Sequence, residues 1–262
     1  MITLGGPRPE ETRELQRPLV GSVQGRDRGV HTGRVEPIFA AALANDPSEI
    51  AAIVLIAPGA VTLRMAHDVL VTELPHTLYR GDTPLHLATA GLRHDASRAL
   101  LAAGAPVDAV NRRGAAALHY ACDPRPASAT WDPAAQQQII RLLVSHGATV
   151  DRPDRGGVTA LHRAVRARSS AAVAALLSAG ADPRAATRKA GSTALHLAVA
   201  PSGAGGTGGT GELQLEIVRM LLAAGATLTD RDGNGVAVVD RIRSRTLRKA
   251  LAAGNFSPEG SL

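Results

Sequence analysis

The sequence has few of the large side chains that usually fill a protein core. Aromatic residues make up 2% of its 262 positions, although hydrophobic residues as a whole make up 45%. A core without aromatic bulk must be filled by Ala, Leu and Val, which suits closely spaced helices. No stretch approaches the roughly 18 uninterrupted apolar residues of a transmembrane helix, so no membrane span is expected.

Cysteine is nearly absent as well. Cys122 is the only one, which excludes a disulfide within the chain and fits a reducing compartment. The first residues lack the apolar stretch of a secretory signal. We therefore expect a cytoplasmic protein.

The basic residues include almost no lysine. Lys189 and Lys249 are the only two, so 27 of the 29 basic residues are arginines, and the formal net charge is +6. One interpretation is the codon bias of a GC-rich genome, which the abundant Ala and Gly also fit. The other is a surface that prefers acidic partners, nucleic acid included.

Two signatures recur in phase along the chain. The first occurs at Gly81-Asp-Thr-Pro-Leu-His86, Gly114-Ala-Ala-Ala-Leu-His119, Gly157-Val-Thr-Ala-Leu-His162 and Gly191-Ser-Thr-Ala-Leu-His196. Each copy is followed by a second signature, which ends in Gly-Ala at 104–105, 147–148, 180–181 and 225–226. The spacing indicates a repeat of about 33 residues, with insertions in the copies that begin at Gly114 and Gly191.

This pattern resembles the ankyrin repeat, in which Thr-Pro-Leu-His-x-Ala is followed by Leu-Leu-x-x-Gly-Ala. The resemblance covers roughly residues 35 to 254 and implies a β-turn and two antiparallel helices per repeat. The expected fold is an all-α solenoid of helix-turn-helix units joined by β-turn or hairpin loops. In this family the repeated His hydrogen-bonds the turn and ties neighbouring repeats together.

The residues themselves support helix pairs. Thr83 is a good N-cap and Pro84 a good first helical residue, and Thr159 and Thr193 occupy the same position in later repeats. The glycines of the second signature stand where a left-handed residue would end a helix. The repeat that begins at Gly114 has Ala116 in place of Thr, so its first helix should be weaker.

The repeats suggest the following organisation. Residues 1–33 form a disordered extension, and the repeat domain spans 34–254, followed by a tail at 255–262. Within the domain, caps at 35–80 and 235–254 flank four repeats at 81–113, 114–156, 157–190 and 191–234. Helices are expected at 37–44, 47–56, 133–146 and 245–253. Trp131, just before the cap Asp132, either staples the first insertion or is an exposed anchor for a partner.

Several features resemble catalytic or ligand sites, and we interpret all of them as structural. The repeated histidines lie in successive repeats, too far apart to share a metal ion. The glycine run near Gly203 follows a helix, whereas a dinucleotide-binding loop follows a strand. Cys122 stands where repeats place small core residues. We therefore expect no catalysis, no cofactor and no metal.

The expected binding surface is the concave groove with its turn tips. The turn-tip cations are Arg112, Arg113, Arg155, Arg188, Lys189 and Arg231. Tyr120 and Arg163 follow the repeated His and are expected to face the groove, and Arg166 lies one turn beyond. Tyrosine and arginine are enriched in binding hot spots, although an ordinary solvated surface would look similar.

The leading hypothesis is a monomeric module that binds a protein partner, possibly an acidic one. An alternative of the same physical kind is an inhibitor that occludes an enzyme's active site. Binding to nucleic acid is less favoured, because the sequence contains no nucleic-acid motif.

Overall fold

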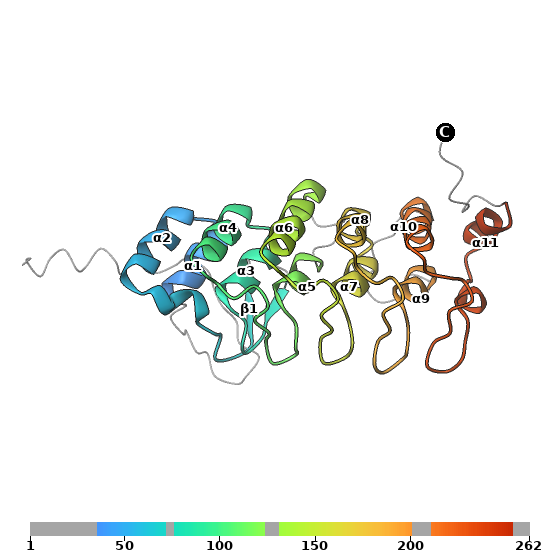
Figure 1. Cartoon of the computed structure of the whole chain (residues 1–262), viewed down its shortest axis with the longest axis horizontal. Helices are drawn as coiled ribbons and strands as arrows, with labels where there is room; N and C mark the ends of the chain where they lie inside the picture. The colour runs from blue at the N-terminus through green and yellow to red at the C-terminus, as the bar shows by residue number, and fades with distance from the viewer. Residues whose placement is uncertain (1–35, 72–75, 124–130, 201–210, 254–262) are drawn as a thin grey trace, which may run out of the picture.

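The structure is a computed structural model that describes residues 36–71, 76–123, 131–200 and 211–253. Its helices form an elongated stack of two rows, and a row of loop tips projects to one side (Figure 1). The expected disordered extension, the tail and most of both insertions lie outside the described residues.

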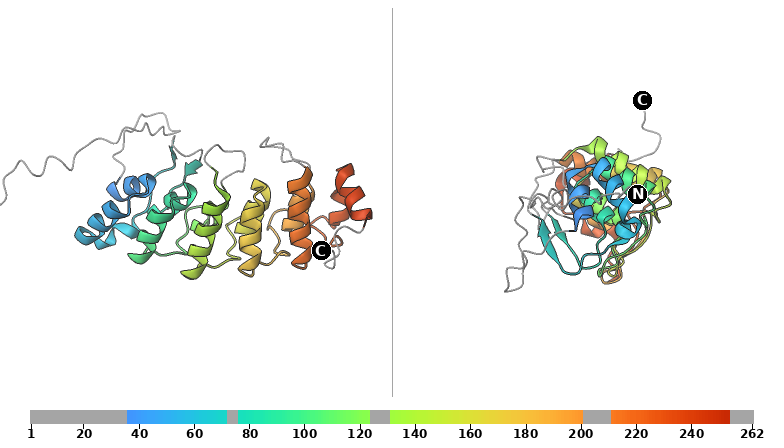
Figure 2. Two further views of the ribbon diagram at one scale, coloured as in Figure 1. Left: turned by 90° about the horizontal axis from the view of Figure 1, so that it is seen from above. Right: turned by 90° about the vertical axis from the view of Figure 1, so that its left-hand side faces the viewer.

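The inner row lies next to the tips and the outer row covers it (Figures 1 and 2). The inner row consists of α1 (Pro37–Ala44), α3 (Pro84–Ala90), α5 (Ala117–Ala121), α7 (Ala160–Ala167), α9 (Ala194–Val199) and the 3-10 helix η3 (Val238–Arg241). The outer row consists of α2 (Pro47–Ile56), α4 (His94–Ala102), α6 (Pro133–Ser145), α8 (Ser170–Ser178), α10 (Gly211–Ala223) and α11 (Arg245–Ala252). Each helix packs on its row neighbours, and the helices from α1 to α10 also pack in pairs across the two rows, so the all-α solenoid prediction is confirmed.

The described strands form one small hairpin. A 3-10 helix, η2 (Pro58–Thr62), follows α2, and β1 (Val69–Val71) then pairs antiparallel with β2 (His76–Leu78). The hairpin stands beside the row of tips in the end-on view (Figure 2). The long link between the first helix pair and the Gly81 repeat therefore folds back onto the stack.

Local sequence determines where the helices begin. Asp46 and Asp132 each accept hydrogen bonds from two backbone N–H groups at the start of α2 and α6, and Pro occupies the next position. Ser169 and Ser244 each accept one backbone N–H group at the start of α8 and α11. These contacts satisfy N–H groups that have no partner inside the helix, so the predicted starts at 47, 133 and 245 are confirmed.

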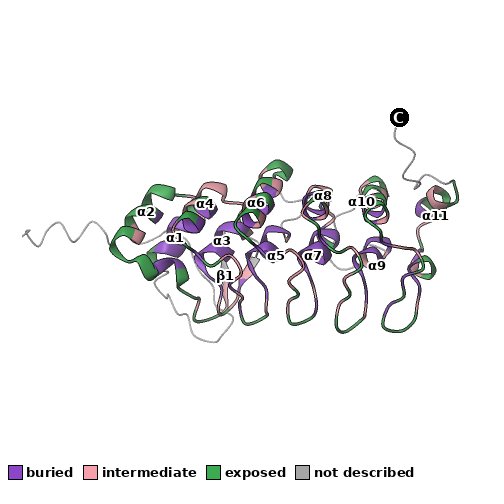
Figure 3. Ribbon diagram, viewed as in Figure 1, coloured by how far each residue is buried: buried purple, intermediate pink, exposed green. Residues whose placement is uncertain are grey.

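The core runs unbroken along the stack. Leu85, Leu118, Leu161 and Leu195 occupy the same position in successive inner helices, and each is at most 3% exposed. Buried alanines separate them, which allows helices to approach closely without aromatic side chains. From α3 to α9 the helices of the inner row are mostly buried, whereas the outer row keeps an exposed face (Figure 3).

Each repeated histidine joins its own helix start to the next repeat. His119 Nδ1 accepts the backbone N–H of Ala116 at 3.1 Å, and its Nε2 lies 3.0 Å from the carbonyl oxygen of Val158. Because Nδ1 accepts, the proton must reside on Nε2, which donates to that carbonyl. His86, His162 and His196 make the same pair of contacts. The role expected for these histidines is confirmed.

A glycine at each tip lets the following tip pack against it. The N–H of Arg188 donates to the carbonyl of Gly156 at 2.9 Å, which brings the two tips together. Gly157 has φ +76°, and a Cβ there would lie 2.5 Å from Arg188 N. Gly235 has nearly the same φ, +75°, but no following tip, and a Cβ there would meet nothing within 4 Å.

The repeat that begins at Gly114 departs from the others. Its inner helix α5 spans only five residues, and its N-cap residue is Ala116, which has no hydroxyl to cap it. Buried Gln136 compensates by donating to the carbonyl of Ala121 at 2.9 Å, while its Oε1 accepts from Ser169 and from the Trp131 indole N–H. Trp131 is therefore half-buried and held at the start of α6.

The two ends of the stack differ. At the C-terminal end, α11 buries Leu247 and exposes basic residues. At the N-terminal end, Leu55 and Ile56 are 85% and 83% exposed, beside an open hollow of about 510 Å³. The first helix pair is thus not a polar cap like the last. No helix in the described part of the chain is long and apolar enough to cross a membrane.

Replacing Gly157 by Ala should destabilise the stack more than the same change at Gly235. Both variants force a side chain into left-handed backbone, at about 1–2 kcal/mol. Gly157→Ala adds the collision with Arg188, for a total of about 2–5 kcal/mol. Denaturant titration of both variants measures the difference, and equal losses would show that the tips do not pack as described.

The histidine bridges should make the fold sensitive to acid. Burial lowers the pKa of all four histidines, that of His119 to about 4. The unfolded chain binds protons near pH 6.5, so stability is complete above that pH and falls as the pH drops toward 4. His119 alone should contribute about 3 kcal/mol to this loss. A free energy of unfolding that stays constant between pH 7 and 4.5 would contradict the buried neutral histidines.

Candidate binding surface

The tips are shaped by short polar side chains that hydrogen-bond their own turns. Asn111 Oδ1 accepts the N–H groups of Arg113 and Ala115, at 2.8 and 3.1 Å. Asp154 and Asp232 make the corresponding contacts in later tips. Such turns hold the backbone in place, which leaves the residues between Asn or Asp and the tip glycine free to project.

The cations expected at the tips do project. Arg112, Arg113, Arg155, Arg188, Lys189 and Arg231 are all exposed. Backbone hydrogen bonds of 2.8–2.9 Å between consecutive tips join Arg112, Arg155, Arg188 and Gly233 to the tip before each. The structure therefore brings these cations together along one edge of the stack.

Three of these cations already have partners. Arg112 pairs with Asp68, and Arg113 donates to Tyr79 Oη at 2.7 Å while its guanidinium lies 4.4 Å from the centre of the Tyr79 ring. Arg231 donates to the carbonyl of Gly235 within its own tip. Arg155, Arg188 and Lys189 form no ion pair with any of the described residues.

The expectation that Tyr120 faces the groove is wrong. Its side chain is 1% exposed, and its hydroxyl donates to Asp82 at 2.7 Å and accepts from Asn111 at 3.0 Å. Its ring also meets His86 edge-on, with centroids 5.2 Å apart. The carboxylate of Asp82, itself fully buried, needs these donors, because a buried charge without hydrogen bonds is strongly destabilising. Tyr120 therefore belongs to the core.

Arg163 is not a free groove cation either. Its side chain is 12% exposed and pairs with Asp123 at 2.7 Å and with Asp154 at 3.3 Å. Burial alone would lower the pKa of Arg163, but the two carboxylates raise it, so the charge is retained. Removing one member of such a buried group is costly. Arg163 thus joins two neighbouring repeats and is unavailable to a partner.

Arg166 keeps the position expected for it. It is exposed in the last turn of α7, where a cation also interacts favourably with the helix dipole. With Tyr120 and Arg163 engaged, the accessible part of the expected surface consists of Arg166 and the tips.

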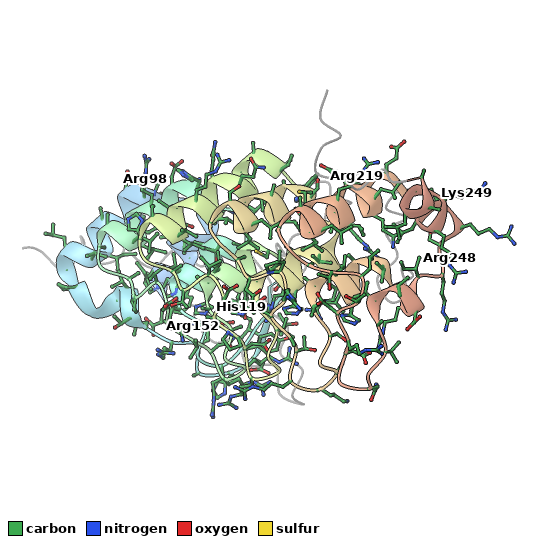
Figure 4. The ribbon with its side chains drawn as sticks, turned by 45° about the vertical axis from the view of Figure 1, so that its right-hand side comes forward. Arg98, His119, Arg152, Arg219, Arg248 and Lys249 are labelled. Carbon is green, nitrogen blue, oxygen red and sulfur yellow. The ribbon has the colours of Figure 1, made fainter. Side chains whose placement is uncertain are left out.

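The groups that could carry chemistry are held in the core. Burial raises the pKa of the Cys122 thiol, which opposes formation of a nucleophilic thiolate. The ring nitrogens of His119 are both engaged, and the ring lies inside the stack (Figure 4). Among the described residues, no cluster of three or more His, Cys, Asp or Glu could hold a metal ion.

Sequence reasoning missed three residues of this surface. Arg80 is exposed, and Tyr79 and Asp68 engage Arg113 and Arg112. Arg80 could have been found, because it precedes Gly81 as Arg113 precedes Gly114. Asp68 gave no such signal, since it lies in the link, outside the repeat pattern.

Replacing Tyr120 by Phe should test its burial. The variant removes one donor from buried Asp82 and should cost about 1–3 kcal/mol of unfolding free energy. Tyr79→Phe is the matched control, because Tyr79 is half-exposed, and it should cost less than about 0.5 kcal/mol. If denaturant titration shows the same loss of unfolding free energy for both variants, the Tyr120 hydroxyl is not buried against Asp82.

Comparison with known proteins identifies the fold. A model of the ankyrin repeat matches residues 80–112, and a model of three ankyrin repeats matches residues 134–232. The crystal structure of EF0377, an ankyrin repeat protein, aligns with 85% of this chain and 94% of its own, with a TM-score of 0.58 and 23% identity. No curated protein matches the sequence significantly.

The two matched ranges together cover half of the chain, and the similarity to EF0377 supports the same fold. Ankyrin repeats are generally protein–protein interaction modules and are typically not enzymes. This chain belongs to the ankyrin repeat family.

Proposed function

We propose that the chain is a non-catalytic module that binds an acidic protein partner along its tips. The observation that carries this proposal is a group of neighbouring tip cations without the ion pairs that hold some other arginines of the stack. Arg152, Arg184 and Arg241 each pair with an aspartate. Arg155, Arg188 and Lys189 are exposed without any described ion pair. Adjacent cations of one sign attract and orient an acidic partner.

The described aromatic residues favour a protein over a single-stranded nucleic acid. Proteins that bind single strands stack the bases on aromatic rings. Here Phe39 and Tyr120 are buried, Tyr79 lies beneath two arginines, and Trp131 is held by Gln136. In the described part of the chain, no Phe, Tyr or Trp side chain is fully exposed as a stacking surface would be.

The charge of the partner does not determine which kind of protein it is or what binding does to it. Arg166, on the inner helix α7, and the neighbouring tips Arg155 and Arg188 are all exposed. An acidic surface or an acidic chain segment would both fit such a strip. Occlusion of an enzyme's active site is the second form this binding would take, and the same residues would carry it.

Charge reversal at the tips tests the proposal. The double variant Arg155→Glu/Arg188→Glu should reduce capture of partners from nuclease-treated native lysate by about tenfold, because attraction becomes repulsion. Stability should hardly change, since Glu retains the Cγ that packs on the preceding tip glycine. Melting temperature and bound protein are measured for each variant.

The matched control is Arg98→Glu/Arg141→Glu, which makes the same change of charge on α4 and α6. Both residues are exposed, and Arg98 lies on the outer row, away from the tips (Figure 4). This variant should capture as much protein as the native chain. Equal losses for the two variants would mean that net charge, and not the tip surface, governs capture.

A further inference from the structure

The link before the Gly81 repeat hydrogen-bonds to the first two tips. The Met65 N–H donates to the carbonyl of Asp82, and the Gly81 N–H donates to the carbonyl of Met65, each at 2.8 Å. Arg64 reaches the second tip and donates to the carbonyl of Val110 at 2.8 Å. The chain thus carries, at one end of the row of tips, a segment already seated on it.

Asp68 is the residue of this segment that the tips recognise by charge. Its carboxylate accepts two hydrogen bonds from the guanidinium of Arg112, through Nε at 2.9 Å and through Nη2. It also accepts the backbone N–H of Arg80 at 2.8 Å. The hydrogen bonds from Arg112 lower the pKa of Asp68. A two-pronged contact of this kind matches the two oxygens of a carboxylate and fixes their orientation.

Arg155 and Arg188 stand in the same place as Arg112 on the next two tips. The backbone N–H of each of the three donates to a carbonyl of the preceding tip, from Arg80, Arg113 and Gly156 respectively, at 2.9 Å. Arg112 holds Asp68, whereas the other two side chains are exposed and form no described ion pair. The following tip has Gly233 in this position, which ends the series.

We propose that Arg155 and Arg188 bind carboxylates of an extended acidic segment of the partner, in the manner in which Arg112 binds Asp68. This inference rests on the proposed function and specifies the chemistry of its partner. Packed repeats succeed one another at about 10 Å, and a polyproline-II chain advances about 3.1 Å per residue and points every third side chain to the same side. The segment therefore carries Asp or Glu at about every third position.

The probe is a short fluorescent Ser-Gly peptide with Asp at every third position. A second peptide of the same composition, with its Asp residues adjacent, controls for net charge. Fluorescence anisotropy with the full chain at low salt should show that the spaced peptide binds several times more tightly. Arg155→Glu/Arg188→Glu should weaken its binding by about tenfold, and Arg98→Glu/Arg141→Glu should leave it unchanged.

Removing the carboxylate of Asp68 should strengthen binding of the spaced peptide. Arg112 would then be free to bind a third Asp of the peptide, beside Arg155 and Arg188. Asp68→Asn should tighten binding of the spaced peptide by about threefold, the scale of one exposed ion pair. Asp68→Ala tests the same point if Asn retains the hydrogen bonds to Arg112. A gain of affinity is not expected from a variant that merely loosens the fold, and melting curves verify folding.

Equal binding of the spaced and adjacent peptides, or unchanged binding after reversal of Arg155 and Arg188, would overturn this inference. If the tip reversal still abolishes capture from lysate in that case, the proposed function stands and only the extended acidic segment is wrong. Tighter, steeply salt-dependent binding of oligothymidylate would instead assign the cations to nucleic acid and overturn the inference.

Discussion

The neutral imidazole that bridges two repeats is the interaction on which the rest of the structure depends. His119 satisfies a free N–H at its own helix start and donates to a carbonyl of the next repeat, and three other histidines do the same. A single buried side chain thereby fixes both the entry of the chain into the helix and the distance to the next unit. Because an imidazolium could not accept at Nδ1, this geometry requires the uncharged form, which burial favours.

The positions of the tips follow from that fixed distance. Once neighbouring repeats are in register, the backbone of one tip hydrogen-bonds the previous one, and glycine is required because no Cβ would fit beneath Arg188. Side chains at equivalent positions then succeed one another at the spacing of the repeat. Arginine occupies one such position in three consecutive tips, so the three side chains form a row. The spacing of this row is set by the stacking of the repeats and not by any single tip.

The weakest repeat is supported by its neighbours. α5 has no hydroxyl cap and spans five residues, yet Gln136 from α6 holds its end, and Ser169 of the following repeat completes that contact. Arg163 makes a further connection to Asp123, directly after this helix. Local helix stability lost in one repeat is compensated by a contact within the repeat and by two contacts from the following repeat, as expected of a stack stabilised mainly between adjacent units.

The sequence by itself determined what depends on neighbouring residues. The caps at Asp46 and Asp132 and the solenoid class follow from hydrogen bonds within a few positions and from a repeated apolar pattern. The histidine bridges, which reach 29 to 40 positions along the chain, followed from the resemblance of the repeated motif to a known family. Only the tertiary structure decided which outward positions are free. The side chain of Tyr120 is buried because the carboxylate of Asp82, 38 positions away, needs a hydrogen-bond donor. The guanidinium of Arg163 pairs with Asp123, which lies 40 positions away along the chain. Burial and charge pairing depend on such distant partners, and a pattern of local spacing does not specify them.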